Sequence, residues 1–502
     1  MHEDWLSLLS GTDVRGDAVA REGHPAVLTE DVARALGAAF ARFLREQGHE
    51  RPLVAVGRDS RVTGEALLRA AVEGLCREGA RVRVCGLCTT PAMFMTTVTE
   101  GFMADGSVMI TASHHPWYRN GLKFFTAQGG LSAQEVGGLL RDARDVPAGL
   151  PDGADVRETD FLSVYARQLE RIMRDALGGG PRPLAGLHIA VDAGNGVGGF
   201  YARVLGELGA DTSGSQFLEP DGMFPHHMPN PEDEEAMRAV SRAVLDSGAD
   251  LGVIFDTDCD RAAIVDATGR EINRNRLIAL ISAILLTETP GATIVTDSVT
   301  SSGLADFIAA RGGVHHRFKR GYHNVIEEAR RLCAAGVDCP LAIETSGHAA
   351  LRENYFLDDG MYLVTRLIVA AMRKKAAGGG IGDWIEGLRE PVEAREVRIA
   401  ITAADFRAAG AAALAAFEAY APAHGGRLAQ DSREGVRASF DVDGRAGAGW
   451  LLIRMSVHDP VMPVNCESDV AGGVRAMLTV LSDALAGCEG LDLSPLRRAL
   501  EA

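Results

Sequence analysis

The residues of this sequence that are best suited to chemistry stand in short polar clusters, each directly after an apolar run. The first cluster, Thr111–Pro116, contains Ser113 followed by two histidines. It comes after the apolar run Ser107–Ile110, and the next apolar run, Leu122–Phe125, carries Lys123. A hydroxyl at a strand end, with imidazoles and an amine nearby in sequence, suits a nucleophile or a phosphate carrier. A Ser/His-rich turn between two strands explains the same residues, because Ser-His-His is not a triad spacing.

Three aspartates form the second cluster. Asp256, Asp258 and Asp260 follow the apolar run Leu251–Phe255, and Arg261 comes next. Alternating carboxylates in one turn can converge on a hard cation such as Mg²⁺, and without a cation they repel one another. Solvated or capping aspartates are the structural alternative. A strand followed by Asp-x-Asp also resembles a haloacid-dehalogenase-type phosphatase, with Asp256 as nucleophile and Asp258 as acid/base.

Three further clusters could bind a sugar phosphate. Glu344 and Ser346 offer a carboxylate and a hydroxyl that can bond neighbouring hydroxyls of a sugar, although a helix-capping turn has the same composition. The basic turn Lys319–Gly321 could face an anion or lie solvated on the surface. Arg454 and Ser456 follow an apolar run near the end of the chain, where such a pair can clamp a phosphate.

The elements that carry these clusters repeat along the chain. Three times, a strand ends near an Asp, a glycine-containing loop and a helix follow, and a later strand ends in a polar cluster. The clusters at Ser113, Asp256 and Glu344 occupy equivalent places in the three units. A period of about 110–150 residues indicates three similar α/β domains, because solenoid repeats are much shorter. The connecting helices predict mostly parallel strands with right-handed crossovers.

The last part of the chain has a different pattern. Strands at 394–401, 435–442 and 450–455, with helices at 404–420 and 469–485, predict a small α+β domain. Gly178–Pro181 and Ala376–Gly380 have the composition of linkers. The expected domains are 1–178 with the serine loop, 179–288 with the aspartates, 289–390 with Glu344, and 391–502.

Composition excludes several classes of protein. The 502 residues carry a net charge of −17, which disfavours nucleic acid or an anionic membrane as partner. No apolar run approaches the ~20 residues of a membrane span. The N-terminal residues show no signal peptide, so we expect a cytoplasmic protein. Eight cysteines in a chain of this length do not indicate a disulfide framework.

Five stretches carry a resemblance that runs nearly end to end. They are, in this order, GTDVRG (11–16), TASHHP (111–116), DTDCDR (256–261), ETSGH (344–348) and RMSVHDP (454–460). Together they resemble the α-D-phosphohexomutase family, and in particular its phosphomannomutase/phosphoglucomutase members. The resemblance implies four domains around a central cleft, three of them similar mixed-sheet α/β units and the last one α+β.

The resemblance implies that Ser113 carries a phosphoryl group between the 1- and 6-positions of a hexose phosphate. A hexose 1,6-bisphosphate would be the intermediate and activator, and one Mg²⁺ per site would join Ser113 to the three aspartates. The family's partners are hexose phosphates, and we expect a monomer or a homodimer. The implied roles are Arg15, Lys123 and Arg261 as electrostatic or acid/base groups, His114 beside the serine, Lys319, Glu344, Ser346 and His348 on the sugar, and Arg454, Ser456 and His458 on the second phosphate.

Some residues depart from the family pattern. His115 stands where the serine loop usually has Asn, and Thr257 stands where the metal loop usually has Gly. The last loop has Val457 and His458 in place of a Gly-Thr pair that would bind phosphate. The Glu344/Ser346 pair resembles that of phosphomannomutase/phosphoglucomutase members, and this resemblance implies glucose or mannose phosphates as substrates. A phosphoglucosamine mutase, an aspartyl phosphatase and a non-catalytic sugar-phosphate-binding paralogue stay open.

Overall fold

The computed structural model describes residues 3–456 and 459–501, which fall into two compact units. The first unit contains the chain up to Leu277 together with Ser346–Trp384. The second contains Ile278–Thr345 and the chain from Ile385 onward. Within the two described stretches, no helix has both the length and the apolar character that crossing a membrane requires.

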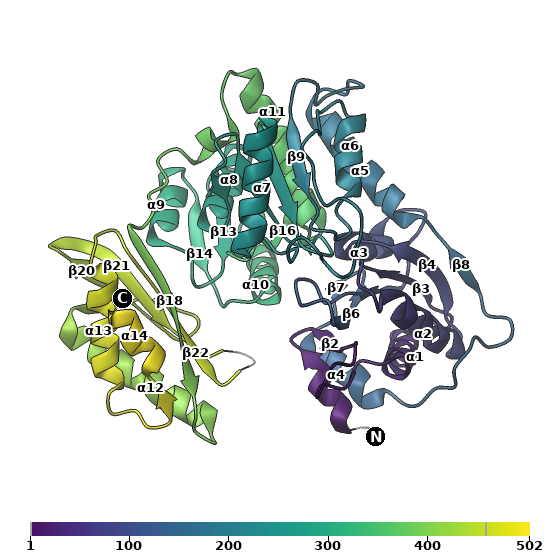
Figure 1. Ribbon diagram of the computed structural model, residues 1–502, viewed down its shortest axis with the longest axis horizontal. Helices are drawn as coiled ribbons and strands as arrows, with labels where there is room; N and C mark the ends of the chain where they lie inside the picture. Colours follow the sequence, from purple (N-terminus) through teal and green to yellow (C-terminus); the bar gives the residue numbers. More distant parts are fainter. Residues whose placement is uncertain (1–2, 457–458, 502) are drawn as a thin grey trace. The chain divides into compact units, whose positions relative to one another are not determined.

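The serine cluster lies at the end of a central strand of the first unit's large sheet, several strands of which are labelled in Figure 1. Strand β5 is buried throughout, pairs with β3 in parallel and with β6 in antiparallel orientation, and ends three residues before Ser113. The strand order is β1-β2-β6-β5-β3-β4-β8, with β7 on β6. The strands are β1 (Leu9–Ser10), β2 (Asp13–Asp17), β3 (Leu53–Arg58), β4 (Arg81–Leu87), β5 (Gly106–Ile110), β6 (Arg119–Thr126), β7 (Gly129–Gly130) and β8 (Val156–Glu158).

Apolar helix faces cover this sheet. One core joins α1, α2 and α4 to β3, β4, β5 and β6. Helices α1 and α2 approach closely at Gly74, where an added Cβ would lie 1.9 Å from the carbonyl oxygen of Arg34. The helices are α1 (Glu30–Glu46), α2 (Gly64–Arg77), α3 (Thr90–Val98), α4 (Ala133–Asp142) and α5 (Phe161–Ala176), and the 3₁₀ helix η1 (Glu3–Leu8) precedes β1.

The aspartate cluster lies in the turn between two strands of a smaller sheet in the same unit. Its order is β12-β11-β10-β9, and β10 is buried throughout. The strands are β9 (Ile189–Asp192), β10 (Leu251–Phe255), β11 (Ala262–Asp266) and β12 (Glu271–Ile272), with helices α6 (Phe200–Glu207) and α7 (Glu234–Ser247). The hairpin β16 (Ala349–Leu351) and β17 (Leu357–Asp358), the 3₁₀ helix η2 (Arg352–Asn354) and helix α11 (Gly360–Ala376) complete the unit.

The expectation of mostly parallel strands is wrong for these two sheets. Strands β5, β3, β4 and β8 are parallel, but β6, β2 and β1 are antiparallel to their neighbours, and in the smaller sheet only β9 and β10 are parallel. The physical reason is the same in both. After each polar cluster the chain turns back at once into a hairpin, so that no crossover helix separates β5 from β6 or β10 from β11. Both sheets are mixed, as the predicted fold class states.

The second unit begins with parallel strands, as predicted. Strand β13 (Thr293–Thr296) lies between β14 (Val314–Arg317) and β15 (Leu341–Ile343) and is parallel to both. Helices α9 (Ser302–Ala310) and α10 (Tyr322–Ala334) connect them. Glu344 follows β15 directly. Helix α8 (Asn275–Glu288) and the 3₁₀ helix η3 (Ile381–Ile385) lie where the chain passes between the units.

A six-stranded antiparallel sheet forms the C-terminal part of the second unit, which agrees with the predicted α+β domain. Its order is β19-β20-β21-β22-β18-β23, and three helices share its apolar core. The elements are β18 (Glu393–Ile401), β19 (Gly426–Leu428), β20 (Val436–Val442), β21 (Arg445–Ile453), β22 (Val461–Ser468), β23 (Leu491–Asp492), α12 (Phe406–Tyr420), η4 (Ala421–His424), α13 (Gly473–Leu485) and α14 (Ser494–Glu501).

Candidate active site

The hydroxyl of Ser113, which follows β5 of the large sheet, contacts two residues of the turn that follows β10 of the smaller sheet. Its Oγ donates to Oδ2 of Asp256 over 2.8 Å, and Nη2 of Arg261 donates to Oγ over 3.0 Å. Both partners lie in or beside the turn between β10 and β11, more than 140 residues along the chain. Ser113 is buried. The structure thus brings the serine cluster and the aspartate cluster into direct contact.

The backbone of Ser113 is held in an unusual conformation. Its φ is +50°, in the left-handed region, which costs a residue with a side chain about 1–2 kcal/mol. Its N–H donates to Oγ1 of Thr111 over 2.9 Å, and its carbonyl accepts from Arg61. Such strain persists only where the surroundings determine the conformation, and it is common at functional sites.

The three aspartates have the donor set of a divalent-cation site. One oxygen of each carboxylate lies within 4.8 Å of one oxygen of the other two, and all three residues are buried. Among the described residues, nothing donates to Oδ1 of Asp258 or to Oδ1 of Asp260. Buried carboxylate oxygens without donors are costly, and this turn holds two of them beside the carboxylate of Asp256. Carboxylate oxygens are the ligands that Mg²⁺ prefers. Thr90 Oγ1 donates to the other oxygen of Asp258 over 2.5 Å and so orients that carboxylate.

Cations of the chain balance only part of this negative charge. Lys123 Nζ, on β6, donates to Oδ2 of Asp260 over 2.5 Å and lies 3.5 Å from Oδ2 of Asp258. Burial opposes the charge of Asp260, but Lys123 and His348 outweigh burial and lower the pKa of that carboxyl. At Asp256, burial and the charges of Asp260 and Asp258 raise the pKa. A divalent cation in the turn would relieve this repulsion.

Arg261 is a fixed positive charge aimed at the serine. Its Nε donates to Oδ2 of Asp256 over 3.2 Å, and its Nη1 donates to Oε2 of Glu232 over 3.3 Å. Burial opposes its charge, but Asp256 and Asp260 outweigh burial and raise the pKa of Arg261. With two of its nitrogens bonded to carboxylates, the guanidinium presents Nη2 to Ser113.

His114 and Arg15 border the serine from its own sheet. Nδ1 of His114 lies 3.3 Å from Oγ of Ser113 and contacts Nη2 of Arg261. Burial and the charge of Arg261 lower the pKa of His114 far below 6.5, so its ring is neutral at pH 7. Arg15, on β2, is paired with Asp13 over 2.7 Å and donates from Nη1 to the carbonyl oxygen of Ala112 over 2.7 Å. The guanidinium therefore holds the backbone just before the serine.

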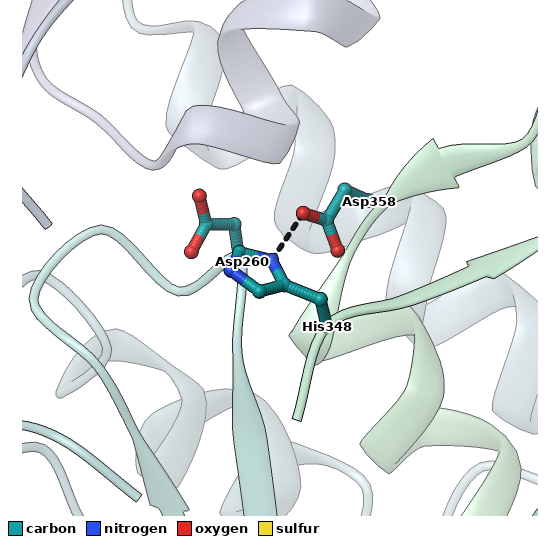
Figure 2. Close-up of side chains that lie close together, drawn as sticks. All are labelled: Asp260, His348 and Asp358. Atoms are coloured by element: carbon teal, nitrogen blue, oxygen red, sulfur yellow. Dashed lines mark hydrogen bonds and ion pairs between the residues drawn. The ribbon is translucent and has the colours of Figure 1, made fainter. Parts of the chain in front are cut away.

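His348 lies beside the aspartate turn, where it forms a second group of close side chains with Asp260 and Asp358 (Figure 2). Its Nδ1 donates to Oδ2 of Asp358. Burial opposes its charge, but Asp358 and Asp260 outweigh burial and raise the pKa of His348 to about 9. An imidazolium has no free lone pair for a metal, so this group acts as an ion-pair network beside the aspartate turn.

In the second unit, the structure brings Glu344 to the basic turn Lys319–Gly321. The N–H of Gly321 donates to Oε1 of Glu344 over 2.5 Å. The side chain of Lys319 is exposed. Ser346, two residues after Glu344, is buried and belongs to the first unit. Glu344 and the basic turn therefore form one group in the second unit.

Glu434 lies between Arg454 and the same basic turn and contacts both. Oε1 of Glu434 accepts from the N–H of Arg320 over 3.1 Å and lies 3.8 Å from Nε of Arg454. Arg454 is buried, and its Nε has no hydrogen-bond partner in the described part of the chain. A buried guanidinium with an unused donor is suited to an anion. Ser456 follows in the same loop, whereas His458 lies outside the described residues.

Four residues of these groups were missed from the sequence. Thr90 supports Asp258, Glu232 pairs with Arg261, Asp358 pairs with His348, and Glu434 lies beside Arg454. Thr90 opens α3 in a Thr-Thr-Pro segment that marks a helix start but says nothing about a distant carboxylate. Glu232, Asp358 and Glu434 stand in ordinary acidic stretches, so their sequence context carries no signal.

Comparisons with known proteins agree with this arrangement. Three family models match the chain: phosphoglucomutase/phosphomannomutase, alpha/beta/alpha domain I at 8–140, domain II at 169–269 and domain III at 273–387. The phosphomannomutase/phosphoglucomutase of Pseudomonas aeruginosa is 29% identical over 462 residues, 91% of this chain and 92% of that protein. The phosphoglucomutase of Neisseria gonorrhoeae is 29% identical over 454 residues, 89% of this chain and 91% of that protein.

Two further relatives extend the agreement. A protein of Xanthomonas campestris pv. campestris named phosphohexose mutases is 30% identical over 468 residues, 92% of this chain and 95% of that protein. A solved phosphoglucomutase/phosphomannomutase family protein from Burkholderia thailandensis matches with a TM-score of 0.79 at 27% identity, covering 96% of this chain and 99% of that one. With three models matching most of its length, the chain belongs to the phosphoglucomutase/phosphomannomutase family.

Proposed function

We propose that the chain is a magnesium-dependent phosphohexomutase that interconverts hexose 1-phosphate and hexose 6-phosphate with Ser113 as the phosphoryl carrier. Its relatives are named phosphoglucomutase, phosphomannomutase/phosphoglucomutase and phosphohexose mutases. The observation that carries the proposal is the placement of the Ser113 hydroxyl 2.8 Å from Asp256 and 3.0 Å from Arg261. Phosphoryl transfer depends on positioning and charge neutralisation, and both are built around this hydroxyl.

In the first half of the reaction, the O–P bond of phosphorylated Ser113 breaks as a sugar hydroxyl forms a new bond to phosphorus. The sugar hydroxyl loses a proton and Oγ of Ser113 gains one, so that charge and atoms balance. Arg261 Nη2 already donates to Oγ and stabilises the charge that develops there. The bisphosphorylated sugar then presents its other phosphate, and the same step runs in reverse.

The three aspartates would hold the cation. The orphaned oxygens of Asp258 and Asp260 and the carboxylate of Asp256 fit Mg²⁺. When bound, the ion supplies positive charge to the phosphoryl oxygens during transfer. Lys123 supplies a further positive charge on the opposite sheet of the same unit and is held by Asp260.

We assign sugar and phosphate recognition to the group in the second unit. Glu344 offers a carboxylate to the sugar hydroxyls, and Lys319 and Arg454 offer charge to the phosphate that is not being transferred. The names of the relatives support glucose or mannose phosphates as substrates. A hexose 1,6-bisphosphate is the expected intermediate and activator.

The phosphatase alternative requires Asp256 as a free nucleophile. Here Oδ2 of Asp256 accepts from Ser113 and from Arg261 Nε, and Oδ1 accepts from the N–H of Arg261. Both oxygens are therefore already engaged, and Oδ2 is occupied by the very hydroxyl that the mutase uses. This geometry favours the serine as the nucleophile.

A coupled assay tests the proposal on glucose 1-phosphate, mannose 1-phosphate and glucosamine 1-phosphate, with the parent, Ser113→Ala and Asp256→Asn. We expect turnover of glucose or mannose phosphate that is lost in Ser113→Ala. Preference for glucosamine 1-phosphate would identify a phosphoglucosamine mutase. Release of inorganic phosphate that requires Asp256 but not Ser113 would identify the phosphatase, and binding without turnover would identify a non-catalytic paralogue.

A further inference from the structure

One buried guanidinium binds nearly the whole serine loop by its backbone. Nη1 of Arg61 donates to the carbonyl oxygens of Pro116 and Arg119 over 2.7 and 3.0 Å. Nη2 donates to the carbonyl oxygens of Ser113 and His115, each over 2.5 Å. Arg61 is among the largest fully buried side chains of the protein. Four carbonyls of one loop thus converge on a side chain that the proposed phosphoryl transfer does not use.

Asp59 binds both the guanidinium and the backbone N–H of Arg61. Nε of Arg61 lies 3.2 Å from Oδ2 of Asp59, and Oδ1 of Asp59 accepts from the N–H of Arg61 over 2.9 Å. Oδ2 of Asp59 also accepts from Oγ1 of Thr111 over 2.7 Å, and Thr111 Oγ1 in turn accepts from the N–H of Ser113. Ser113 is therefore held at both its N–H and its carbonyl by one connected network.

The cost of this arrangement indicates that the loop geometry matters. Arg61 and Asp59 are both wholly buried, and taking two charges out of water is expensive, the more so because Nε of Arg61 makes no hydrogen bond within the described residues. The guanidinium carbon also lies over the ring of Phe224, 5.2 Å from its centroid. In return, the network fixes Ser113 at φ +50°, the conformation in which Oγ lies near Asp256 and Arg261.

We propose that Arg61, with Asp59 and Thr111, is a positioning device that holds the backbone of Ser113 so that its hydroxyl is aimed at the phosphoryl-transfer site. The inference rests on the proposed function for the consequence in catalysis, but the restraint on the loop stands on contacts of the resting protein. Arginine is required because its planar fork offers paired donors in two directions. A lysine ammonium carries the same charge on one atom and cannot span the four carbonyls.

The first test replaces Arg61 by Lys and compares it with Arg34→Lys. Arg34 is also buried and paired with two carboxylates, but it lies on α1 in the helix layer. Because misplacement of a reacting atom by about 1 Å can cost 10²-fold, we expect Arg61→Lys to lower kcat by about 10²-fold while KM for the hexose phosphate changes less than about threefold. Arg34→Lys is expected to keep the parental kcat. A parental kcat in Arg61→Lys, or a loss confined to KM, would overturn the proposal.

A milder pair of variants guards against a folding defect. Thr111→Val keeps the shape but removes the hydroxyl that links Asp59 to the N–H of Ser113, and Thr111→Ser retains that hydroxyl. We expect kcat to fall in Thr111→Val and to return to within about threefold of the parent in Thr111→Ser. Equal losses in both variants would mean that packing, and not the network, is what matters.

The second readout does not depend on turnover. Hydrogen–deuterium exchange of the resting protein is expected to rise in Arg61→Lys at residues 113–119, while strand β6 beyond Leu122 keeps its parental protection. Unchanged exchange in the loop would refute the positioning role. If the parent turns over no hexose phosphate at all, the proposed function fails, and the exchange result still decides whether Arg61 holds the loop.

Discussion

Nζ of Lys123 lies 2.5 Å from Oδ2 of Asp260 and so joins the strand after the serine cluster to the aspartate turn. The two residues are 137 positions apart, and each is buried. The pair keeps a positive charge next to the carboxylates that would hold a cation. The charge of Lys123 can therefore have two effects, assisting phosphoryl transfer and competing with Mg²⁺ for the carboxylates.

Replacing Lys123 by Met is expected to reduce kcat by about 10²–10³-fold, because a preorganised positive charge is lost from the transfer site. The same change is expected to tighten Mg²⁺ binding, since the carboxylates lose a competing cation. A titration of activity against Mg²⁺ measures both effects. Lys375→Met removes an equally short but exposed pair with Asp250 and serves as the control. A parental kcat in Lys123→Met would contradict the assignment.

Replacing Asp258 by Asn is expected to raise the Mg²⁺ concentration for half-maximal activity by about tenfold or more, because a charged ligand oxygen becomes neutral. A chelator is expected to abolish turnover in the parent, and added Mg²⁺ to restore it. Asp246→Asn, on the exposed side of α7, provides the matched control. The assignment fails if Asp258→Asn and the parent show the same Mg²⁺ dependence.

The His227–Asp192 pair predicts a pH-dependent stability. Nε2 of His227 lies 3.1 Å from both oxygens of Asp192. Burial opposes the charge of His227, but the carboxylate of Asp192 outweighs burial and raises the pKa of His227. A raised pKa contributes stability that is complete below the unfolded value of about 6.5 and is lost as the pH rises through the folded value. The thermal midpoint of His227→Gln should therefore fall furthest below the parent in mild acid, and the gap should narrow in alkali. A gap that does not vary with pH would disprove the charged pair.

His115 departs from the family pattern, yet its side chain is expected to matter little. Burial and the charge of Arg15 lower the pKa of His115 to about 3, so the ring is neutral at pH 7. Its backbone carbonyl is what Arg61 binds, and any residue supplies a carbonyl. We expect His115→Asn to keep kcat within about threefold of the parent. A larger loss of kcat in steady-state assays would assign the imidazole of His115 a role of its own.

The sequence predicted the site to the extent that its residues stand at strand ends. Ser113, Asp256 and Glu344 follow buried strands, and the side chains at such ends can be recognised from apolar runs alone. The hairpins could not be predicted in the same way. Strand β11 follows the aspartate turn without an intervening helix, but it has the same apolar character as a parallel strand. The direction of a strand relative to its neighbour depends on the length of the connection between them, and the apolar pattern of the strand itself does not show that direction.

The supporting residues could not be found in this way. Arg61 stands in a polar stretch after β3 and looks like a solvated arginine, but it is buried because four carbonyls of a distant loop need donors. Glu434 and Thr90 likewise gain their roles from partners more than 100 residues away. Such pairings are a property of tertiary structure, and neither composition nor periodicity encodes them.

Phosphorylation of Ser113 is the claim on which the account depends. Incubation of the Mg²⁺-loaded protein with glucose 1,6-bisphosphate, followed by intact mass and peptide mapping, measures it directly. We predict an adduct of about 80 Da on Ser113 that disappears in Ser113→Ala together with turnover. A phosphoryl group found on Asp256, or mutase activity that survives in Ser113→Ala, would contradict the account.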